Sequence, residues 1–325
     1  ITLDAINEKK KKPFNAGVMV RTSDLNEILE LRTFQELLFV VPNMRTCKND
    51  PVEAAKTVVE SKFIFYLEER HTGKAPFYFR IEVKSRMDLS KKSAFAKKMA
   101  AEIERRTSRS LINSTSNYEI ELRLIENNQG EFNILVKFYT LKDDRFSYRR
   151  ESTAQSLKPM NAALACELVK EYLKEDATIL DPFCGVGTLL IERHKLVKAN
   201  TMYGIDLSGE AIDKARINTE LARQIIHYIN KDFFQFEHEY QFDEIITDMP
   251  FVTGRKSENE IRELYDRFFA RSAKLLKQDG YIIIYSHNKE FLKSLFVKHN
   301  IVVEKEYEIS MKEGTYVYVL RYRNL

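Results

Sequence analysis

Apolar and polar residues follow one another in the C-terminal half of the chain in a pattern that predicts strands and helices in turn. Short apolar runs occupy residues 177–183, 201–208, 225–234 and 242–251, and a fifth run, "YIIIYSH", starts at Tyr281. Segments with helical spacing lie between them, such as "GTLLIERHKLV" and "SENEIRELYDRFFARSAKLLK", and "QDG" is expected to be a turn before the fifth strand. This order is typical of a parallel sheet wrapped by helices on both faces.

The two ends of this region refine the prediction. "IVVEKEYEIS" and "TYVYVLRYR" are joined by "MKEG" and predict an antiparallel hairpin after the last parallel strand. A helix is expected to begin near Pro159, and Ser208 is expected to cap the helix that follows the second strand. A doubly wound sheet that ends in a hairpin differs from the usual dinucleotide-binding pattern.

The N-terminal half has a different pattern, typical of an α+β domain. "APFYFRIEVKSR" predicts a strand, and "SNYEIELRLIENNQGEFNILVKFY" predicts two strands joined by a turn. Between them "SKKSAFAKKMAAEIERRTSR" predicts an amphipathic helix, with Phe95, Met99 and Ile103 on one face. We therefore expect a small subdomain at residues 1–50, a second domain at 51–150 and a third at 151–325.

Charge is distributed unequally between the halves. Residues 1–150 carry 28 Lys and Arg against 21 Asp and Glu, whereas the remainder carries 24 against 27. The N-terminal half is therefore the part expected to meet a polyanion. The basic side chains of the predicted helix are the candidates for contacts with RNA phosphates. They are Lys91, Lys92, Lys97, Lys98, Arg105 and Arg106.

Several classes of protein are disfavoured by composition. No run of about 18 apolar residues occurs, so no membrane span and no membrane partner are expected. Cys47, Cys166 and Cys184 are far apart, and no histidine stands at metal-ligand spacing, so neither a disulfide framework nor a metal site is expected. We expect a cytoplasmic monomer.

A turn with two glycines follows the first C-terminal strand. "LDPFCGVGTLLIE" places Gly185 and Gly187 between strand and helix, where the backbone can approach a ligand closely and helix amides are free. The dinucleotide fingerprint requires a third glycine at residue 190, where this chain has leucine. A pyrophosphate on this helix is therefore disfavoured.

Acidic residues end the next two strands. Asp206 is placed to accept both hydroxyls of a ribose. Asp232 and Phe233 end the third strand, where an acid could receive an adenine amino group and a ring could pack on the base. The expected ligand is an adenosine whose tail is not a diphosphate, and S-adenosylmethionine fits this description.

These motifs resemble those of class I S-adenosylmethionine-dependent methyltransferases. "DPFCGVGT" is similar to the first motif of that family, "GIDLS" to the second, "NKDFF" to the third and "DMPF" to the fourth. The resemblance implies a Rossmann-like methyltransferase sheet and S-adenosylmethionine as cofactor. The residues that it places against the cofactor are Pro159, Asp181, Phe183, Gly185, Gly187, Thr188, Asp206, Leu207, Asp232 and Phe233.

The fourth motif implies the chemistry. Family members that methylate exocyclic amines carry Asn, Asp or Ser, then two prolines and an aromatic; Asp248, Pro250 and Phe251 match, and Met249 departs. A flipped base would lie against Phe251 and donate from its amino group to the Asp248 carboxylate and a carbonyl near Pro250. No cysteine follows Cys184, which disfavours a covalent cysteine mechanism. Asp248, Pro250 and Phe251 are the candidate catalytic residues.

The N-terminal half resembles the THUMP RNA-binding domain, because a strand, a basic helix and a hairpin directly precede the methyltransferase motifs. In that family a small N-terminal subdomain precedes THUMP, and the pair grips the 3′ end of tRNA. The order of the two resemblances is similar to that of THUMP-containing guanine-N2 methyltransferases. It implies methyl transfer to guanine N2 in tRNA, with RNA as the partner.

Three alternatives remain open from the sequence. The first is the same chemistry on guanine N2 of 23S rRNA. The second is methylation of adenine N6, which uses the same fourth motif. The third is a catalytically inactive RNA-binding protein that kept the fold.

Overall fold

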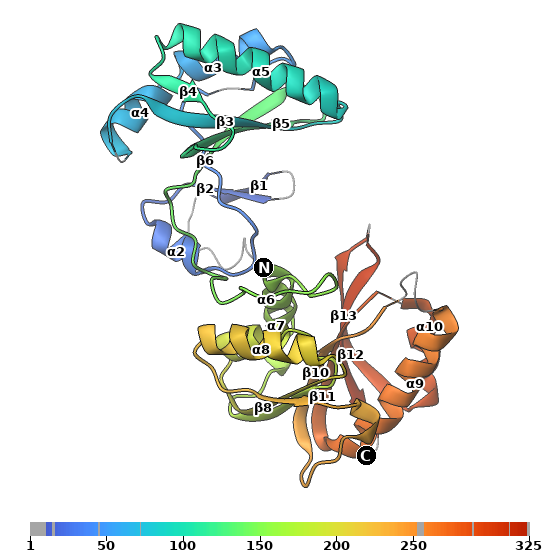
Figure 1. Cartoon of the computed structure of the whole chain (residues 1–325). Coiled ribbons are helices and arrows are strands. Elements are labelled where there is room, and N and C mark those ends of the chain that lie inside the picture. Colours follow the sequence, from blue (N-terminus) through green and yellow to red (C-terminus); the bar gives the residue numbers. More distant parts are fainter. Residues whose placement is uncertain are drawn as a thin grey trace. The chain divides into compact units, whose positions relative to one another are not determined.

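The computed structural model describes residues 11–14, 17–44, 46–71, 73–251, 257–287, 289–311 and 313–323. The chain forms two compact units. The smaller unit is Gln35–Lys142, and the larger unit combines Ile1–Phe34 with Asp143–Leu325 (Figure 1). No helix in the described ranges has both the length and the apolar character needed to cross a bilayer.

The larger unit is built on a mixed sheet. Counted over the described residues, seven strands follow the order β12-β13-β11-β10-β7-β8-β9. The neighbours among β7 to β11 pair in parallel, and β13 pairs antiparallel with both β11 and β12. The bounds are β7 Ala177–Asp181, β8 Ala199–Asp206, β9 His227–Asn230, β10 Phe242–Asp248, β11 Leu276–Ser286, β12 Ile301–Ser310 and β13 Thr315–Tyr322. The predicted Rossmann-like sheet with a terminal hairpin is confirmed.

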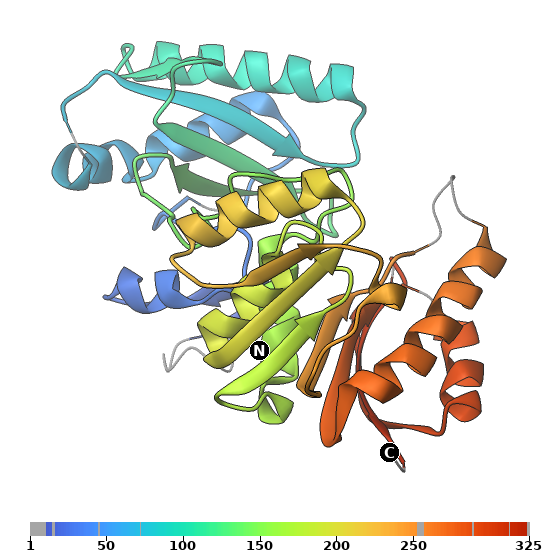
Figure 2. The same ribbon diagram turned by 60° about the horizontal axis from the view of Figure 1, so that its bottom comes forward.

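Helices cover both faces of this sheet, and each face has its own core. Along β11, Ile282 and Ile284 pack in the core with α9 and α10, whereas Ile283 and Tyr285 pack with α6, α7 and α8. This alternation is what a strand buried on both faces produces. Figure 2 shows the orange helices α9 and α10 beside the strands. The helices are α6 Pro159–Leu168, η1 Lys170–Tyr172, α7 Thr188–Leu196, α8 Gly209–Leu221, η2 Phe233–Gln235, α9 Glu258–Leu275 and α10 Lys289–Lys298.

Local sequence signals explain where several of these elements begin. Pro159 opens α6, and the Ser208 hydroxyl caps α8 by accepting from the Ala211 amide, as predicted. The predicted "QDG" turn is wrong, because β11 begins at Leu276 directly after α9. The pairing with β10 is irregular at this place, and Gly280 lies where a Cβ would come within 2.8 Å of the Leu276 side chain.

The smaller unit has one sheet with helices on one face. Over its described residues the strand order is β4-β3-β5-β6, with β5 and β6 antiparallel and the other pairs parallel. Phe95, Met99 and Ile103 are buried against the sheet, which confirms the predicted helix face. Helices α3 and α5 lie along the same side in Figure 1. The bounds are α3 Pro51–Glu60, α4 Phe63–Arg70, β3 Phe77–Lys84, α5 Leu89–Arg106, β4 Leu111–Asn113, β5 Ile120–Glu126 and β6 Phe132–Phe138.

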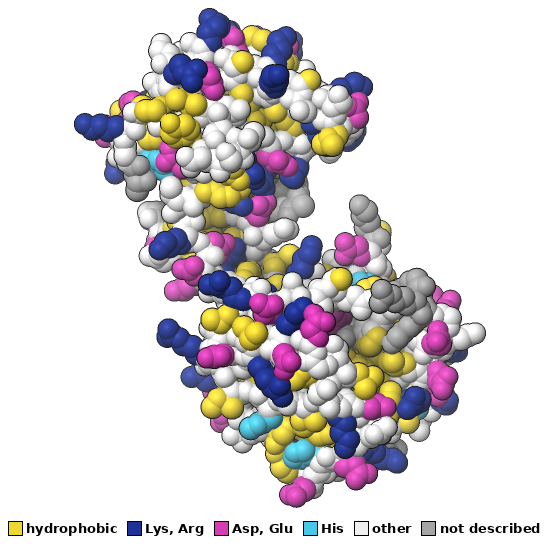
Figure 3. Space-filling model, viewed as in Figure 1, with side chains coloured by type: hydrophobic (Ala, Val, Ile, Leu, Met, Phe, Trp, Pro, Cys, Tyr) yellow, Lys and Arg dark blue, Asp and Glu magenta, His cyan; other side chains and the backbone are white. Residues whose placement is uncertain are grey.

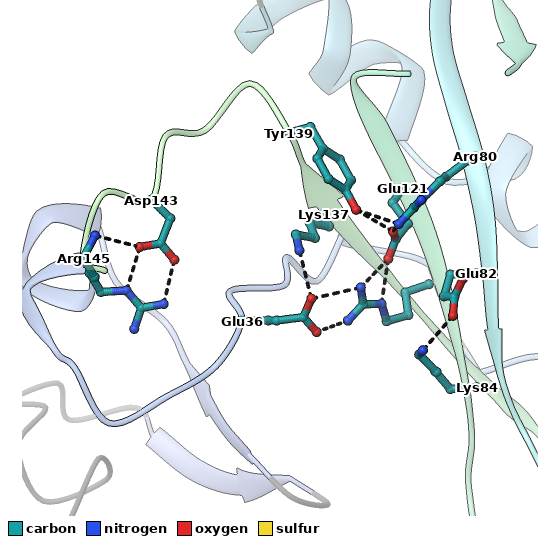
Figure 4. Close-up of polar contacts among 10 residues, drawn as sticks. Glu36, Arg80, Glu82, Lys84, Glu121, Lys137, Tyr139, Asp143 and Arg145 are labelled. Carbon is teal, nitrogen blue, oxygen red and sulfur yellow. Dashed lines mark hydrogen bonds and ion pairs between the residues drawn. The ribbon is translucent and has the colours of Figure 1, made fainter. Parts of the chain in front are cut away.

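The other face of this sheet carries a charged network (Figure 4). Glu121 on β5 is fully buried, and its carboxylate accepts from Arg80 and Tyr139 through Oε2 and from Arg123 through Oε1. The two guanidinium groups hold the pKa of Glu121 below its ordinary value despite burial, which acts in the opposite direction. On this face of the sheet, the side chains are therefore held by ion pairs rather than by apolar packing.

Residues 35–50 belong to this smaller unit, which differs from the boundary expected at residue 50. Glu36 joins the charged network through Arg123. Phe39 and Cys47 form isolated antiparallel bridges with Val136 and Phe132 on β6. A segment that extends the edge of the sheet in this way is part of its fold.

Residues 11–34 belong instead to the larger unit. Arg145 donates through Nη1 to the carbonyls of Leu31 and Phe34, each at 2.9 Å. Arg32 forms a two-pronged ion pair with Glu192 on α7, with both bonds at 2.7 Å. The elements in this segment are β1 Lys11–Phe14, β2 Gly17–Val20 and α2 Leu25–Glu30.

A buried ion pair fixes α7 against β10. Arg193 and Glu244 both have fully buried side chains, with Nε–Oε2 at 2.9 Å and Nη2–Oε1 at 2.7 Å. Glu244 also accepts from the Lys174 amide at 2.7 Å. Because burial removes solvation from both charges, each depends on the other.

Replacement of one partner should therefore strongly destabilise the larger unit. We expect Glu244→Gln, which preserves size and removes the charge, to lower the free energy of unfolding by about 3 kcal/mol. Urea denaturation followed by tyrosine fluorescence measures this change. The exposed control Glu239→Gln should stay within about 0.5 kcal/mol of the parent. Equal stability of the two variants would contradict the role of the ion pair.

Candidate functional site

The turn between β7 and α7 requires glycine at residue 187. Gly185 and Gly187 have φ values of +52° and +79°, and Gly187 is the N-cap of α7. A Cβ on Gly187 would lie 2.1 Å from the hydroxyl oxygen of Tyr228, which itself hydrogen-bonds Thr219. From the sequence, glycine was expected here to allow close approach of a ligand. The structure shows that Tyr228 also leaves no room for a side chain at residue 187.

Acidic residues end the strands on both sides of the point where the strand order reverses. β7 and β10 are neighbours, and the chain continues from them in opposite directions across the sheet. Asp181 ends β7, Asp206 ends β8 and Asp248 ends β10. Open α/β sheets bind ligands at this carboxyl edge.

Burial governs the electrostatics of these acids. It raises the pKa of Asp181 to about 8, and the neighbouring charges of Asp248 and Asp206 act in the same direction. Burial also raises the pKa of Asp248 to about 7. No described basic side chain pairs with either carboxylate, so the edge suits a ligand that brings positive charge and hydrogen-bond donors.

Asp206 fixes the glycine turn to the end of β8. Its Oδ2 accepts from the Gly185 amide and its Oδ1 from the Ser208 amide, both at 2.9 Å. Each carboxylate oxygen can accept a second bond, so ribose hydroxyls can still be received here. Leu207 beside it is highly exposed, with 74% of its surface accessible.

Asp232 and Phe233 occupy different environments. The Asp232 carboxylate caps the short helix η2 by accepting from the Phe234 amide at 2.9 Å. Phe233 is buried, with its ring centroid 5.8 Å from that of Phe183 and 6.0 Å from that of Phe268. The half-buried Phe183 is therefore the more accessible of the two predicted rings.

The fourth motif leaves one carboxylate oxygen open. Asp248 Oδ1 is shielded from solvent and has no hydrogen-bond partner among the described residues. Met249 points into the core, with 1% of its surface exposed, and its amide donates to the Tyr285 carbonyl at 2.9 Å. Phe251 is half-buried, and its ring centroid lies 4.7 Å from that of His287. An unpaired buried acceptor at this position fits an incoming donor.

Tyr285 is a residue that the sequence prediction missed. It pairs in register with Asp248, and burial raises its pKa to about 12, with the Asp248 charge acting in the same direction. The nearby side chains of Asn161 and Thr315 act in the opposite direction on this pKa. Tyr285 also packs in one core with Ala162 of α6, so the start of that helix lies near Tyr285. In the sequence, Tyr285 stands in an apolar run and no motif marks it as a site residue.

The predicted RNA-binding side chains on α5 differ in their surroundings, and Lys98 is exposed on the helix surface. Lys91 pairs with Asp88, and both Arg105 and Arg106 pair with Glu102. Hydrogen bonds from Arg105 and Arg106 lower the pKa of Glu102 to about 2. Figure 3 shows acidic side chains interspersed among the basic ones on this surface.

Lys92 and Lys97 have a different position from the paired residues. They line a groove of about 620 Å³ between β3 and α5, together with Lys84 and its ion-pair partner Glu82. In the described part of this sheet, β4 pairs only with Phe77–Phe79 of β3, so the rest of that edge carries no further strand. The groove therefore combines lysines with open backbone groups. Within the described ranges, no group of three potential metal ligands gathers closely enough to hold an ion.

The fold and the acid-lined edge define a class I S-adenosylmethionine-dependent methyltransferase. Residues 149–316 match the family described as "RMKL-like, methyltransferase domain", a region that makes up just over half of the chain. The chain belongs to this family. Residues 47–217 also match a family described as "DNA methylase". This matched region ends before β10 and therefore does not include Asp248.

Two curated relatives carry related names. A Methanocaldococcus jannaschii protein named "tRNA (guanine(6)-N2)-methyltransferase" is 23% identical over 193 residues, 46% of this chain and 50% of that protein. A Methanothermococcus thermolithotrophicus protein named "Probable tRNA (guanine(10)-N2)-dimethyltransferase" is 26% identical over 133 residues, 38% of this chain and 78% of that protein. The chain thus spans about half the length of the first of these relatives.

A solved structure extends the likeness in fold to nearly the whole chain. TrmN from Thermus thermophilus has a TM-score of 0.68 and 17% identity, covering 95% of this chain and 89% of that one. At this identity the likeness concerns the fold.

The steric role of Gly187 gives a prediction about the cofactor. A methyl group there must displace Tyr228, so we expect Gly187→Ala to weaken binding of S-adenosylhomocysteine at least about 10-fold in isothermal titration calorimetry. Gly130→Ala is the matched control, because Gly130 has a φ of +77° but open space around its Cβ position. Unchanged affinity in Gly187→Ala would show that the turn does not shape the cofactor site.

Proposed function

We propose that this protein is an RNA methyltransferase that transfers a methyl group to the exocyclic N2 of guanine in tRNA. The observation that carries the proposal is the open, buried Oδ1 of Asp248 at the switch point of a methyltransferase sheet. The names of both curated relatives support the choice of base and RNA.

The residues of the carboxyl edge fit the cofactor that the family uses. The glycine turn allows a close approach, Asp206 can receive ribose hydroxyls, and the uncompensated acids favour a cationic ligand. When bound, S-adenosylmethionine supplies an activated methyl group on a sulfonium. Further proposed cofactor contacts stand at the ends of these elements or in the segments after them: Asp181 at the end of β7, Phe183 after β7, Leu207 after β8, Asp232 before η2 and Pro159 at the start of α6.

Asp248 acts in this proposal by orienting the acceptor amine. Its free oxygen receives one N–H, and a backbone carbonyl at the rigid Pro250 receives the other, so that the nitrogen lone pair faces the methyl group. Phe251, backed by the His287 ring, provides a surface for the base. An exocyclic amine is a weak nucleophile, so positioning is the main assistance available.

We further propose that the Gln35–Lys142 unit is a THUMP-like RNA-binding domain. Its α5 groove offers Lys92 and Lys97 without an acidic partner among the described residues, which suits phosphate. The paired residues Lys91, Arg105 and Arg106 are less available, and Lys98 is exposed on the helix surface.

A second candidate function is methylation of adenine N6. The match of residues 47–217 to the DNA methylase family supports it, as does the fourth motif. Nucleoside analysis of the product separates the two, because N2-methylguanosine and N6-methyladenosine are distinct. Parallel reactions with tRNA and 23S rRNA separate the two RNA substrates.

Asp248 should be required for transfer and not for cofactor binding. With unmodified tRNA and labelled S-adenosylmethionine, we expect N2-methylguanosine from the parent and a rate at least about 100-fold lower from Asp248→Ala. Affinity for S-adenosylhomocysteine should remain within about threefold of the parent. Because protonation places an O–H donor on the Asp248 carboxyl and removes an acceptor for the amine, the parent rate should rise as the pH increases through about 7. Undiminished transfer by the variant would refute the role of Asp248.

Two pairs of lysines on the same helix test the RNA-binding groove. We expect Lys92→Ala/Lys97→Ala to weaken tRNA binding about 10-fold in fluorescence anisotropy and to reduce the slope of log affinity against log salt by about 1 to 2. The matched pair Lys91→Ala/Lys98→Ala removes the same charge outside the groove and should have a much smaller effect. Equal loss in both pairs would show that general charge, and not the groove, binds RNA.

A further inference from the structure

Arg149 stands at the start of the methyltransferase region and contacts both loops that lead into the cofactor site. Its Nε donates to the Thr188 hydroxyl at 2.8 Å, at the first residue of α7. Its Nη1 donates to the Glu151 carbonyl, and its Nη2 to the Leu157 carbonyl at 3.4 Å, two residues before α6 begins. One side chain therefore connects the glycine turn to the segment before Pro159.

The positive charge of Arg149 has no carboxylate partner in the described part of the chain. Arg32, Arg145 and Arg193 of the same unit each form an ion pair with an acid, at 2.7, 2.6 and 2.7 Å. Arg149 is half-buried like Arg32, and desolvation lowers its pKa. A guanidinium has five N–H donors, of which the three recorded bonds use three. The group therefore has both the charge and the donors to receive an anion.

The backbone that carries Arg149 is held rigidly. Asn218 on α8 is fully buried, and its Oδ1 accepts from the amides of Arg150 and Glu151 at 3.1 and 2.9 Å. Its Nδ2 donates to the carbonyls of Glu151 and Val186, at 3.0 and 3.1 Å. Since Val186 is part of the glycine turn, Asn218 fixes residues 150–151 directly to that turn. Such preorganisation is expected of a binding group and reduces the entropy lost on binding.

The start of α7 adds donors at the same place. The first amide of this helix that bonds within it is that of Ile191, to the Gly187 carbonyl, and no side chain caps the helix. The amides of the first turn, beginning with Thr188, therefore reinforce the positive potential that the guanidinium creates.

We propose that Arg149 is a cofactor-binding residue that recognises the carboxylate at the amino-acid end of S-adenosylmethionine. This cofactor carries positive charge at its sulfonium and ammonium and a single negative charge at its carboxylate. The carboxyl edge of the sheet has the opposite distribution, with several unpaired acids and one unpaired guanidinium beside the glycine turn. The proposal rests on the family's use of this cofactor and adds the group that receives its carboxylate.

Two ligands that differ only in the carboxylate test this role in binding experiments, without catalysis. S-Adenosylhomocysteine has the carboxylate, and its decarboxylated analogue keeps the ammonium and the adenosine. We expect the parent protein to bind S-adenosylhomocysteine about 10- to 100-fold more tightly in isothermal titration calorimetry. Arg149→Gln should lose this preference while binding the decarboxylated ligand as the parent does. Arg149→Lys should retain part of it.

The neighbouring exposed residue provides a control, since Arg150→Gln removes the same charge one position away and should keep the full preference. A parent protein that binds both ligands equally would overturn the proposal without reference to any variant. So would an equal loss of affinity for both ligands in Arg149→Gln, which would identify Arg149 as a structural link between loops. If the parent binds neither ligand, the assignment of the cofactor itself fails, which is a separate result.

Discussion

The buried ion pair between Arg193 and Glu244 joins the two elements on which the site depends. Arg193 lies on α7, whose first turn follows the glycines, and Glu244 lies on β10, whose last residue is Asp248. With both side chains fully buried, the two charges can be satisfied only in one relative placement of helix and strand. This ion pair in the core therefore fixes the position of the glycine turn relative to the Asp248 carboxylate.

The carboxyl edge above this pair shows the opposite electrostatic arrangement. Asp181 is buried, and Asp248 is half-buried with its Oδ1 shielded from water; no described cation compensates either carboxylate, and both pKa values are raised. An isolated protein is not stabilised by such an arrangement, because burial disfavours each charged form. A ligand that brings cationic groups and hydrogen-bond donors relieves this desolvation. The unfavourable desolvation therefore lies at the proposed binding edge, whereas the charges of Arg193 and Glu244 in the core compensate each other.

The sequence predicted this sheet well because its central strands β7 and β10 and the second half of β11 are apolar runs buried on both faces. It failed where tertiary contact overrides local signal. "QDG" has the composition of a turn but lies in an irregular part of β11, and residues 35–50 join the smaller unit through bridges to β6. The candidate site residues that belong to motifs could be named from the sequence, whereas Tyr285 and the proposed cofactor-binding residue Arg149 could not. Their roles depend on neighbours such as Asn161 and Thr188, which are far away in the sequence.

The departure of Met249 from the two-proline pattern has a structural explanation. Its side chain is buried in the core, and its amide donates to the Tyr285 carbonyl, a bond that proline could not make. Residue 249 therefore extends the pairing of β10 with β11 by one bond, whereas Asp248 and Pro250 on either side of it are half-buried at the edge. The side chain of Met249 thus points away from that edge, and its amide joins the end of β10 to β11. In the proposed reaction, the adjoining rings of Phe251 and His287 are then the surface that would distinguish one base from another.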